Sequence, residues 1–489
     1  MKTGCYVGGE WYHPRSDRTV RNVNPANRDD VLAEFPLATS ADAERAIDAA
    51  AAAFPAWRAT PAPERGRVLW RAADLARARA EEIARTMTRE EGKVLREARG
   101  EVAKGIALLE YYAGAGFRLG GKTLPSEARE TFTYTLRQPL GPVGLIAPWN
   151  FPWAIPVWKA APALVAGNTM VLKPATLTPA CTSLFVDILA EAGLPPGVLN
   201  VVVGSGREVG EAIVASPAIR AVSFTGSNAV GQGLYVKAAS RGIKVTCEMG
   251  GKNAVVVLDD ADLDQAAAAI HGGAFGSTGQ RCTATSRVIA LEPVKDALLE
   301  RLVASARAIR VGNGLDETID MGPAVDQDQL TTDLRYIELG KAEGARLVTG
   351  GGRPAGLERG FFVEPTIFDG VAPSMRIFKE EIFGPVLAVS TAHTPEEALA
   401  AANAVEYGLT TSIFTQNLDA AMRYIDAVET GMVHVNEPTV GGEAQLPFGG
   451  IKATGVGGRE MSEEGLDFFT ETKTVFINYS GGGARSMIR

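Results

Sequence analysis

The feature that most constrains the fold is an alternation of short apolar segments with longer segments of helical spacing, which begins at Gly141. The expected strands are Val143 to Ala147, Thr169 to Lys173, Leu199 to Val203, Ala221 to Phe224 and Lys244 to Glu248, and the expected helices lie around Trp158 to Ala166 and from Pro179 to Ala192. Such an alternation is typical of βαβ units, in which helices cover both faces of a parallel sheet. The pattern therefore predicts an α/β fold with an open parallel sheet.

A second series of the same kind follows. Its expected strands are Ala254 to Leu258, Ser286 to Leu291 and Ile413 to Thr415, with helices from Asp262 through Phe275 and near Val294 to Arg310. A chain of 489 residues is too long for one core of ordinary size. We therefore expect two α/β domains in tandem.

Segments outside the two series are expected to extend them. The sequence predicts a hairpin formed by residues 8–11 and 20–23, and then amphipathic helices from Ser40 to Phe54 and from Glu64 to Arg99. Thr131 to Arg137 alternates apolar residues with threonines, which indicates a strand with one covered face. The tail from Leu466 to Tyr479 is also strand-like, and it could pair with that strand or with the edge of a neighbouring subunit.

Composition excludes several classes of partner. The net charge is −8 and there is no block of Lys and Arg, which argues against a nucleic-acid or anionic-membrane partner. The four cysteines are scattered without a Cys-x-x-Cys pair, so neither a disulfide framework nor a metal site is expected. With no signal-peptide pattern and no long apolar run, we expect a cytoplasmic protein that acts on a small molecule.

Cys282 is the candidate nucleophile. It lies among small residues after a glycine-rich segment, where we expect a helix start that would lower the pKa of the thiol and favour the thiolate. A single cysteine is more often a buried core residue, and the sequence around it leaves that alternative open. The same core interpretation applies to Cys5, Cys181 and Cys247.

Glu248 and Asn150 are candidates for supporting roles. Glu248 ends an apolar strand against two glycines, so it could turn into a cleft where desolvation raises its pKa into the range of a general base. Asn150 lies in a turn stiffened by two prolines, and a rigid amide is a suitable oxyanion donor. The alternatives are a surface glutamate at a strand end and an asparagine that only forms a turn.

Glycine loops after expected strands are candidate phosphate sites. Gly204, Gly206 and Gly210 form G-x-G-x-x-x-G, one residue longer than the dinucleotide fingerprint. The segment from Phe224 to Gly231 also runs from a strand into a helix start, whose free N–H groups suit a phosphate. Either loop could instead be a structural turn.

Taken in order, these segments closely resemble the aldehyde dehydrogenase superfamily along nearly the whole chain. The matching motifs are Pro148-Trp149-Asn150-Phe151-Pro152, Lys173-Pro174-Ala175, Phe224-Thr225-Gly226-Ser227, Glu248-Met249-Gly250-Gly251-Lys252-Asn253, Gly279-Gln280-Arg281-Cys282, Glu380-Glu381-Ile382-Phe383-Gly384-Pro385 and Pro447-Phe448-Gly449-Gly450-Ile451-Lys452. The resemblance implies an aldehyde dehydrogenase-like fold with two open parallel-sheet domains and a β oligomerisation arm. It places a dinucleotide-binding domain at residues 1–117 and 138–247, a catalytic domain at 248–446, and the arm at 118–137 and 466–489.

The resemblance also implies a role for each matching residue. Cys282 is the nucleophile, Asn150 stabilises the oxyanion, and Glu248 activates water to release a carboxylic acid, which disfavours a CoA-acylating enzyme. Lys159 and Glu460 match positions associated with a proton relay. The residues expected to bind NAD or NADP are Trp149, Lys173, Thr176, Gly206, Gly210, Gly226, Ser227, Val230, Glu381 and Phe383.

Cofactor preference and substrate rest on finer features. NAD-preferring members often carry glutamate where this chain has Thr176, so we expect NADP to be accepted, and a preference for NADP over NAD stays open. The segments around Cys282 and 468–473 are similar to bacterial 2-oxoglutarate semialdehyde dehydrogenases. A carboxylated aldehyde needs a cation in the substrate tunnel, for which Arg281 is one candidate, although its side chain could equally point into the subunit core or an interface. Trp153, Trp158 and Phe448 are expected to form the tunnel wall, and plain core packing is the alternative for the two tryptophans.

Two alternatives to a semialdehyde dehydrogenase remain. One is a broad-specificity aliphatic or aromatic aldehyde dehydrogenase, which would need no cation in its tunnel. The other is a catalytically idle structural protein that keeps the fold. The resemblance further implies a homodimer or a homotetramer.

Overall fold

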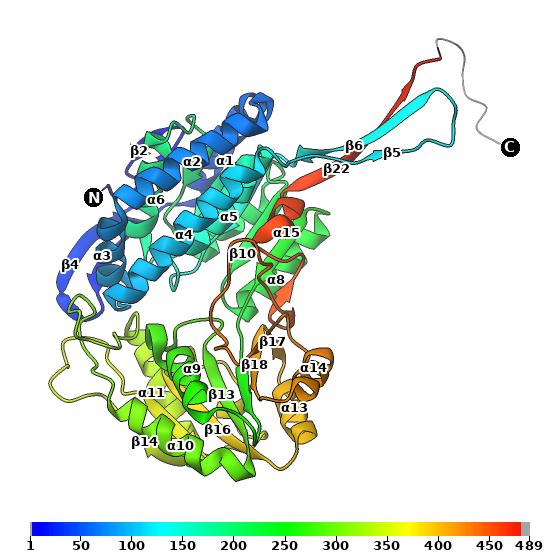
Figure 1. Ribbon diagram of the computed structural model, residues 1–489. Coiled ribbons are helices and arrows are strands. Elements are labelled where there is room, and N and C mark those ends of the chain that lie inside the picture. The colour runs from blue at the N-terminus through cyan, green and yellow to red at the C-terminus, as the bar shows by residue number, and fades with distance from the viewer. Residues whose placement is uncertain (1, 481–489) are drawn as a thin grey trace.

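The computed structural model describes residues 2–480. Two sheets, each covered by helices on both faces, form the body, and a long β ribbon projects from it (Figure 1). The predicted α/β class, with two open sheets and an arm, is confirmed. Within the described residues, no helix is long and apolar enough to cross a membrane.

The first sheet has eight strands in the order β2-β1-β9-β8-β7-β10-β11-β21. Their bounds are β1 Cys5–Val7, β2 Glu10–Tyr12, β7 Pro142–Ile146, β8 Thr169–Lys173, β9 Leu199–Val201, β10 Ala221–Thr225, β11 Lys244–Glu248 and β21 Gly455–Val456. The five central strands are parallel, whereas β1, β2 and β21 add antiparallel edges. The strand order reverses between β7 and β10, and in such sheets ligands bind beyond the carboxyl ends of the strands at this point.

Helices cover both faces of the first sheet. One face packs against α1 Ser40–Ala59, α7 Glu211–Ala215 and α8 Asn228–Ser240, and a short π-helical turn, Gly206–Gly210, precedes α7. The other face packs against α2 Ala62–Ala78, α3 Ala80–Glu91, α4 Leu95–Ala115, α5 Ala154–Ala166 and α6 Pro179–Glu191.

The second sheet has seven strands in the order β14-β15-β16-β13-β12-β18-β19, all parallel to their neighbours except β14. Their bounds are β12 Asn253–Val257, β13 Thr285–Leu291, β14 Arg346–Thr349, β15 Thr366–Asp369, β16 Val386–Ala392, β18 Thr410–Phe414 and β19 Met432–Val435. One face packs against α9 Leu263–Phe275 and α10 Glu292–Arg307. The other packs against α11 Gln327–Ala342, α12 Arg376–Lys379, α13 Pro395–Asn403 and α14 Leu418–Ala427.

The projecting ribbon consists of β5 Thr123–Leu124, β6 Thr131–Pro139 and β22 Thr470–Asn478, in the order β22-β6-β5 (Figure 1). β22 pairs with β6 in an antiparallel register from Thr470↔Pro139 to Asn478↔Thr131. The predicted pairing of the C-terminal strand with the Thr131 strand is therefore confirmed. The part of the expected arm at residues 481–489 lies outside the described residues. The remaining elements are β3 Thr19–Asn24, β4 Asn27–Pro36, β17 Tyr407–Gly408, β20 Ile451–Lys452 and α15 Ser462–Phe468.

Three expected elements differ in the structure. Residues 8–11 do not pair with 20–23: β1 pairs with β2 across Gly8 and Gly9, and β3 pairs with β4. The helix expected from Glu64 to Arg99 is divided into α2, α3 and α4. It breaks at Arg79 and again at Gly92. Gly92 has a φ of 102°, and a Cβ there would lie 2.8 Å from Pro323, so only glycine fits. The strand expected from Leu466 begins at Thr470, because α15 occupies the first residues.

Candidate active site

Cys282 lies in the loop between a 3₁₀ turn, Gly276–Gly279, and β13. In this turn Gly279 has a φ of 69°, and an added Cβ would lie 2.3 Å from the carbonyl oxygen of Gly384, so the tight approach requires glycine. The loop places Cys282 where two cavities meet, one of about 250 Å³ and one of about 340 Å³. The thiol is therefore accessible from two sides.

The surroundings of Cys282 raise its pKa to about 12, chiefly through burial and then through the negative charges of Glu381 and Glu248. This corrects the expectation of a lowered pKa. The cysteine follows a short 3₁₀ turn instead of beginning a helix, so no helix dipole favours the thiolate.

Glu248 is the last residue of β11 and shares the 250 Å³ cavity with Cys282. It is only 3% exposed, and its Oε2 has no hydrogen-bond partner among the described residues. Gly449 makes room for it, since a Cβ there would lie 2.3 Å from Glu248 Oε1. Burial, and then the charge of Glu460, raise its pKa well above the usual value. A buried carboxyl with one unbonded oxygen beside a nucleophile suits a general base.

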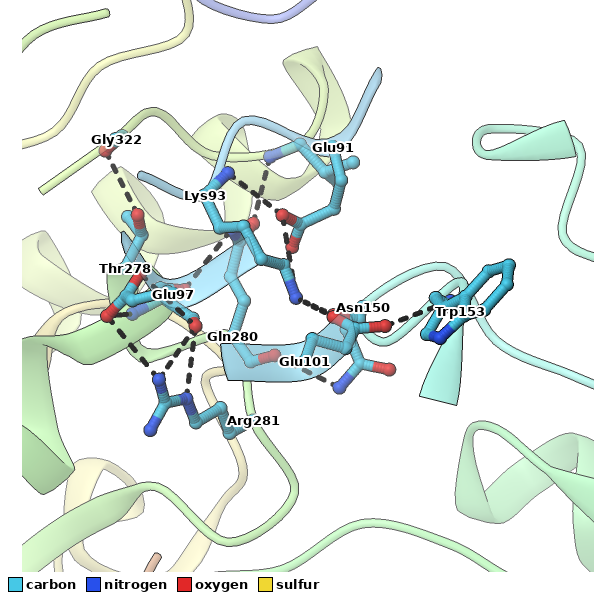
Figure 2. Close-up of polar contacts among 12 residues, drawn as sticks. Glu91, Lys93, Glu97, Glu101, Asn150, Trp153, Thr278, Gln280, Arg281 and Gly322 are labelled. Atoms are coloured by element: carbon cyan, nitrogen blue, oxygen red, sulfur yellow. Dashed lines mark hydrogen bonds and ion pairs between the residues drawn. The ribbon is translucent and has the colours of Figure 1, made fainter. Parts of the chain in front are cut away.

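Asn150, which follows β7, borders the same cavity, and both its side-chain amide and its backbone carbonyl form hydrogen bonds. Its Nδ2 donates to the carbonyl of Gln280 at 3.0 Å, and its own backbone carbonyl accepts from Lys93 Nζ at 2.7 Å (Figure 2). Gln280 in turn accepts from the backbone N–H of Val325 at 2.8 Å. The amide next to the nucleophile therefore has a fixed orientation, which an oxyanion donor needs.

A buried ion pair lies behind Asn150, and no motif in the sequence indicated it. Lys93 Nζ lies 2.6 Å from Glu101, whose other oxygen accepts from the backbone N–H groups of Trp153 and Ala154 at 2.9 and 3.0 Å (Figure 2). Charged side chains are normally solvent-exposed, and Glu101 lies beyond the helix expected from Glu64 to Arg99. Glu101 thus bonds the first turn of α5, while Lys93 bonds the turn before it.

Lys159 and Glu460 form a buried ion pair next to Trp158, which borders the 250 Å³ cavity. Lys159 Nζ forms an ion pair with Glu460 and donates to Ser223 Oγ at 2.8 Å, and Trp158 Nε1 donates to the other oxygen of Glu460 at 2.8 Å. No hydrogen bond joins this pair directly to Glu248 within residues 2–480. Its influence on Glu248 is through charge.

A third cavity, of about 550 Å³, lies at the switch point of the first sheet and shares Trp149, Gly226 and Ser227 with the Cys282 cavity. Eight of the predicted cofactor residues border it: Trp149, Lys173, Thr176, Gly206, Gly210, Gly226, Ser227 and Val230. The other two, Glu381 and Phe383, border the Cys282 cavity. The three cavities therefore form a series of about 550, 250 and 340 Å³, and Cys282 lies between the 250 Å³ and the 340 Å³ cavities.

The residues present fit an anionic dinucleotide. Lys173 is 7% exposed, and its Nζ donates only to the backbone carbonyls of Pro174 and Gly204, at 2.8 and 3.3 Å. Burial without a counter-ion lowers its pKa to about 8. Ser227 precedes α8, whose first N–H groups open toward the same cavity. An uncompensated cation near a helix N-terminus suits the ribose and phosphate groups of NAD or NADP.

The 340 Å³ cavity on the opposite side of Cys282 is bordered by Trp158, Phe448 and Arg281, as expected. The rings of Trp158 and Phe448 pack 5.2 Å apart. Trp153 is a correction: it is completely buried in the core, with its ring 5.7 Å from that of Phe185, and it borders neither cavity next to Cys282. It points away because the first turn of α5 directs Trp153 and Trp158 to different sides.

A doubly wound domain whose switch-point cavity adjoins a cavity bordered by a cysteine and a buried glutamate is the arrangement of a nucleotide-dependent dehydrogenase. The aldehyde dehydrogenase family model matches residues 11–475, and the chain therefore belongs to the aldehyde dehydrogenase family. It is an NAD(P)-dependent aldehyde dehydrogenase.

Relatives resemble the chain over almost its whole length. It is 47% identical to alpha-ketoglutaric semialdehyde dehydrogenase from Bacillus subtilis, over 96% of this chain and 97% of that one. It is 48% identical to 2,5-dioxopentanoate dehydrogenase from Saccharolobus solfataricus, over 97% and 99%. Among solved structures, betaine aldehyde dehydrogenase from Staphylococcus aureus in complex with NAD⁺ is 34% identical, with a TM-score of 0.95 over 98% of this chain and 95% of that one.

Proposed function

We propose that this aldehyde dehydrogenase oxidises a short aldehyde that carries a carboxylate at its far end, with 2-oxoglutarate semialdehyde as the leading substrate. The observation that carries the proposal is the cavity of about 340 Å³ beyond Cys282, where aromatic walls are combined with a cation, Lys104, that forms no ion pair among the described residues. The names of relatives at 46–48% identity point to the same substrate.

The proposed reaction begins at Cys282. Its Sγ attacks the aldehyde carbon as a thiolate, and Asn150 Nδ2 and the Cys282 backbone N–H stabilise the oxyanion of the thiohemiacetal. When bound, NAD(P)⁺ supplies the acceptor for the hydride that this carbon loses. The acyl group is then held as a thioester on Cys282.

Glu248 carries the second half of the proposed reaction. Its carboxylate takes a proton from water, the water oxygen attacks the thioester carbon, and the thiolate of Cys282 leaves as the carboxylic acid forms. We propose that the Lys159–Glu460 pair then accepts this proton from Glu248 and passes it on. Lys173, Gly226 and Ser227 are proposed to hold the cofactor.

We further propose that NADP is accepted and that the site permits a preference for NADP over NAD. Thr176 borders the 550 Å³ cavity and carries no charge that would repel a 2'-phosphate. Lys173 lies in the same cavity without a carboxylate partner in the described part of the chain. A strict requirement for NAD in steady-state kinetics would contradict this proposal.

Domain limits, assembly and location complete the proposal. The dinucleotide-binding domain spans residues 1–117 and 138–247 and the catalytic domain spans 248–446. The arm, at 118–137 and 466–489, joins subunits into a homodimer or a homotetramer. A cytoplasmic location is consistent with four cysteines that are free in the structure.

The test is a panel of 2-oxoglutarate semialdehyde, succinate semialdehyde, an aliphatic aldehyde and benzaldehyde, each with NAD and with NADP, followed by absorbance of the reduced cofactor. We expect high kcat/KM for the carboxylated aldehydes. Preference for uncharged aldehydes would favour the broad-specificity alternative. Absence of activity with every substrate would favour the idle structural protein.

A further inference from the structure

One face of α4 forms a wall of the 340 Å³ cavity. Glu97, Gly100, Glu101 and Lys104 all border it, and their spacing of three and four residues places them along one side of the helix. Cys282 borders the same cavity. An aldehyde bound to Cys282 through this cavity therefore has the charged groups of α4 beside it.

The cation expected to bind an anionic substrate, Arg281, is already paired. Its Nη2 lies 3.4 Å from Glu97 Oε1, and its Nε and Nη2 donate to Ser277 Oγ at 3.1 and 2.9 Å. Figure 2 shows the guanidinium directed at Glu97. Because Glu97 offsets its charge, Arg281 is a weaker attractor for a substrate carboxylate.

The carboxylates on this wall are also satisfied. Glu97 accepts from the backbone N–H of Ser277 at 2.8 Å as well as from Arg281. Glu101 is bound to Lys93 at 2.6 Å and to two backbone N–H groups. Neither carboxylate forms an ion pair with Lys104 in the described part of the chain.

Lys104 is the cation that lacks a counter-ion. Its Nζ donates to the carbonyl of Gly442, which borders the same cavity, and within residues 2–480 it forms no ion pair. Burial lowers its pKa to about 8, although the negative charge of Glu443 acts in the opposite direction. A partly buried ammonium group with one neutral acceptor is stabilised when an anion binds beside it.

We propose that Lys104, and not Arg281, binds the far carboxylate of the substrate and thereby selects carboxylated aldehydes. This inference rests on the proposed function, because it names the residue that recognises that substrate class. Trp158 and Phe448 contact the carbon chain between the two ends. Arg281 stays paired with Glu97 and shapes the wall.

The experiment compares 5-oxopentanoate with pentanal, which have the same number of carbons but differ in the carboxylate, for the wild type and for Lys104→Met. Removing a charge-assisted hydrogen bond raises the KM for 5-oxopentanoate about 10- to 100-fold. The KM for pentanal should stay within about twofold, since an uncharged tail forms no such bond. Lys104→Arg should restore most of the selectivity.

Controls separate the possible outcomes. Lys341→Met removes an exposed lysine that is bound to Glu338 at 2.7 Å, and it should change neither KM. Arg281→Met should raise the KM for 5-oxopentanoate less than Lys104→Met does. An equal rise for both aldehydes in Lys104→Met, no rise for either, or a larger selective effect of Arg281→Met would overturn the inference.

The wild type tests the underlying function separately. If it prefers 5-oxopentanoate but Lys104→Met keeps that preference, the inference about Lys104 fails and the proposed function stands. If the wild type shows no preference for 5-oxopentanoate over pentanal, the proposed function fails and the inference fails with it.

Discussion

Glu248 shows how a single residue gains its chemistry from where the chain places it. The end of β11 brings its carboxyl into a cavity, where burial raises its pKa and leaves Oε2 without a partner among the described residues. The protonated form cannot take a proton from water. A rise in pH through this raised pKa therefore produces the active carboxylate.

We expect the kcat of the wild type to rise with pH from neutral into the alkaline range. Two groups act in the same direction, because the pKa of Cys282 is raised to about 12 and its reactive form is the thiolate. The rate should fall as the pH drops, when both groups are protonated. The measurement is a pH–rate profile, and a flat or falling alkaline limb would contradict the expectation.

Glu248→Gln tests the division of roles. We expect the steady-state kcat to fall about 10²- to 10⁴-fold, because the water that attacks the thioester loses its base. A burst of one equivalent of reduced cofactor per site should remain, since formation of the thioester does not use Glu248. Stopped-flow absorbance measures both quantities. The exposed Glu300→Gln is the control, and loss of the burst would assign Glu248 to the first half-reaction.

At the scale of elements, the Lys93–Glu101 pair joins α4 to the start of α5. Lys93 is 1% and Glu101 4% exposed, and together they bond the backbone of Asn150, Trp153 and Ala154. Removing one member of a buried ion pair leaves the other charge uncompensated. The pair therefore links the stability of two helices to the orientation of Asn150.

Lys93→Met should lower the free energy of unfolding by about 3–5 kcal/mol and should also lower kcat. Adding Glu101→Gln removes the unpaired charge but keeps an acceptor for the two N–H groups, so the double variant should be more stable than Lys93→Met alone. Urea denaturation measures the stabilities. If the loss of unfolding free energy in the double variant equals the sum of the losses in the two single variants, Lys93 and Glu101 do not interact.

At the scale of the whole molecule, the ribbon of β5, β6 and β22 stands away from the body (Figure 1). Phe132 and Ile477 are register partners on this ribbon, and they are 46% and 45% exposed. Apolar side chains on a projecting ribbon are typical of a surface that a second subunit covers.

The double substitution Phe132→Asp/Ile477→Asp should therefore reduce the mass of the assembly. Charges at these positions would have to be buried against the partner subunit without counter-ions, which is costly. Light scattering after size-exclusion chromatography measures the mass. Leu418→Asp, at an apolar residue of α14 that is 74% exposed, is the control and should leave the mass unchanged. An unchanged mass in the double variant would place the interface elsewhere.

Local patterns in the sequence were sufficient for the motifs and for several buried strands. β8 and β11 have the predicted bounds, because a short apolar run between turn residues specifies a buried strand without reference to the rest of the chain. The cofactor residues from Lys173 to Val230 follow strands of one sheet, and the ends of parallel strands converge on one edge.

The sequence by itself thus determined the α/β class, the family and the residues that matched its motifs. Only the tertiary structure decided that burial raises the pKa of Cys282, that Trp153 lies in the core, and that Glu97 occupies Arg281 while Lys104 lacks a counter-ion. The physical reason is that pKa values, side-chain direction and ion pairing depend on neighbours from distant segments. Glu97 and Arg281 are far apart along the chain, and only folding brings their charges together.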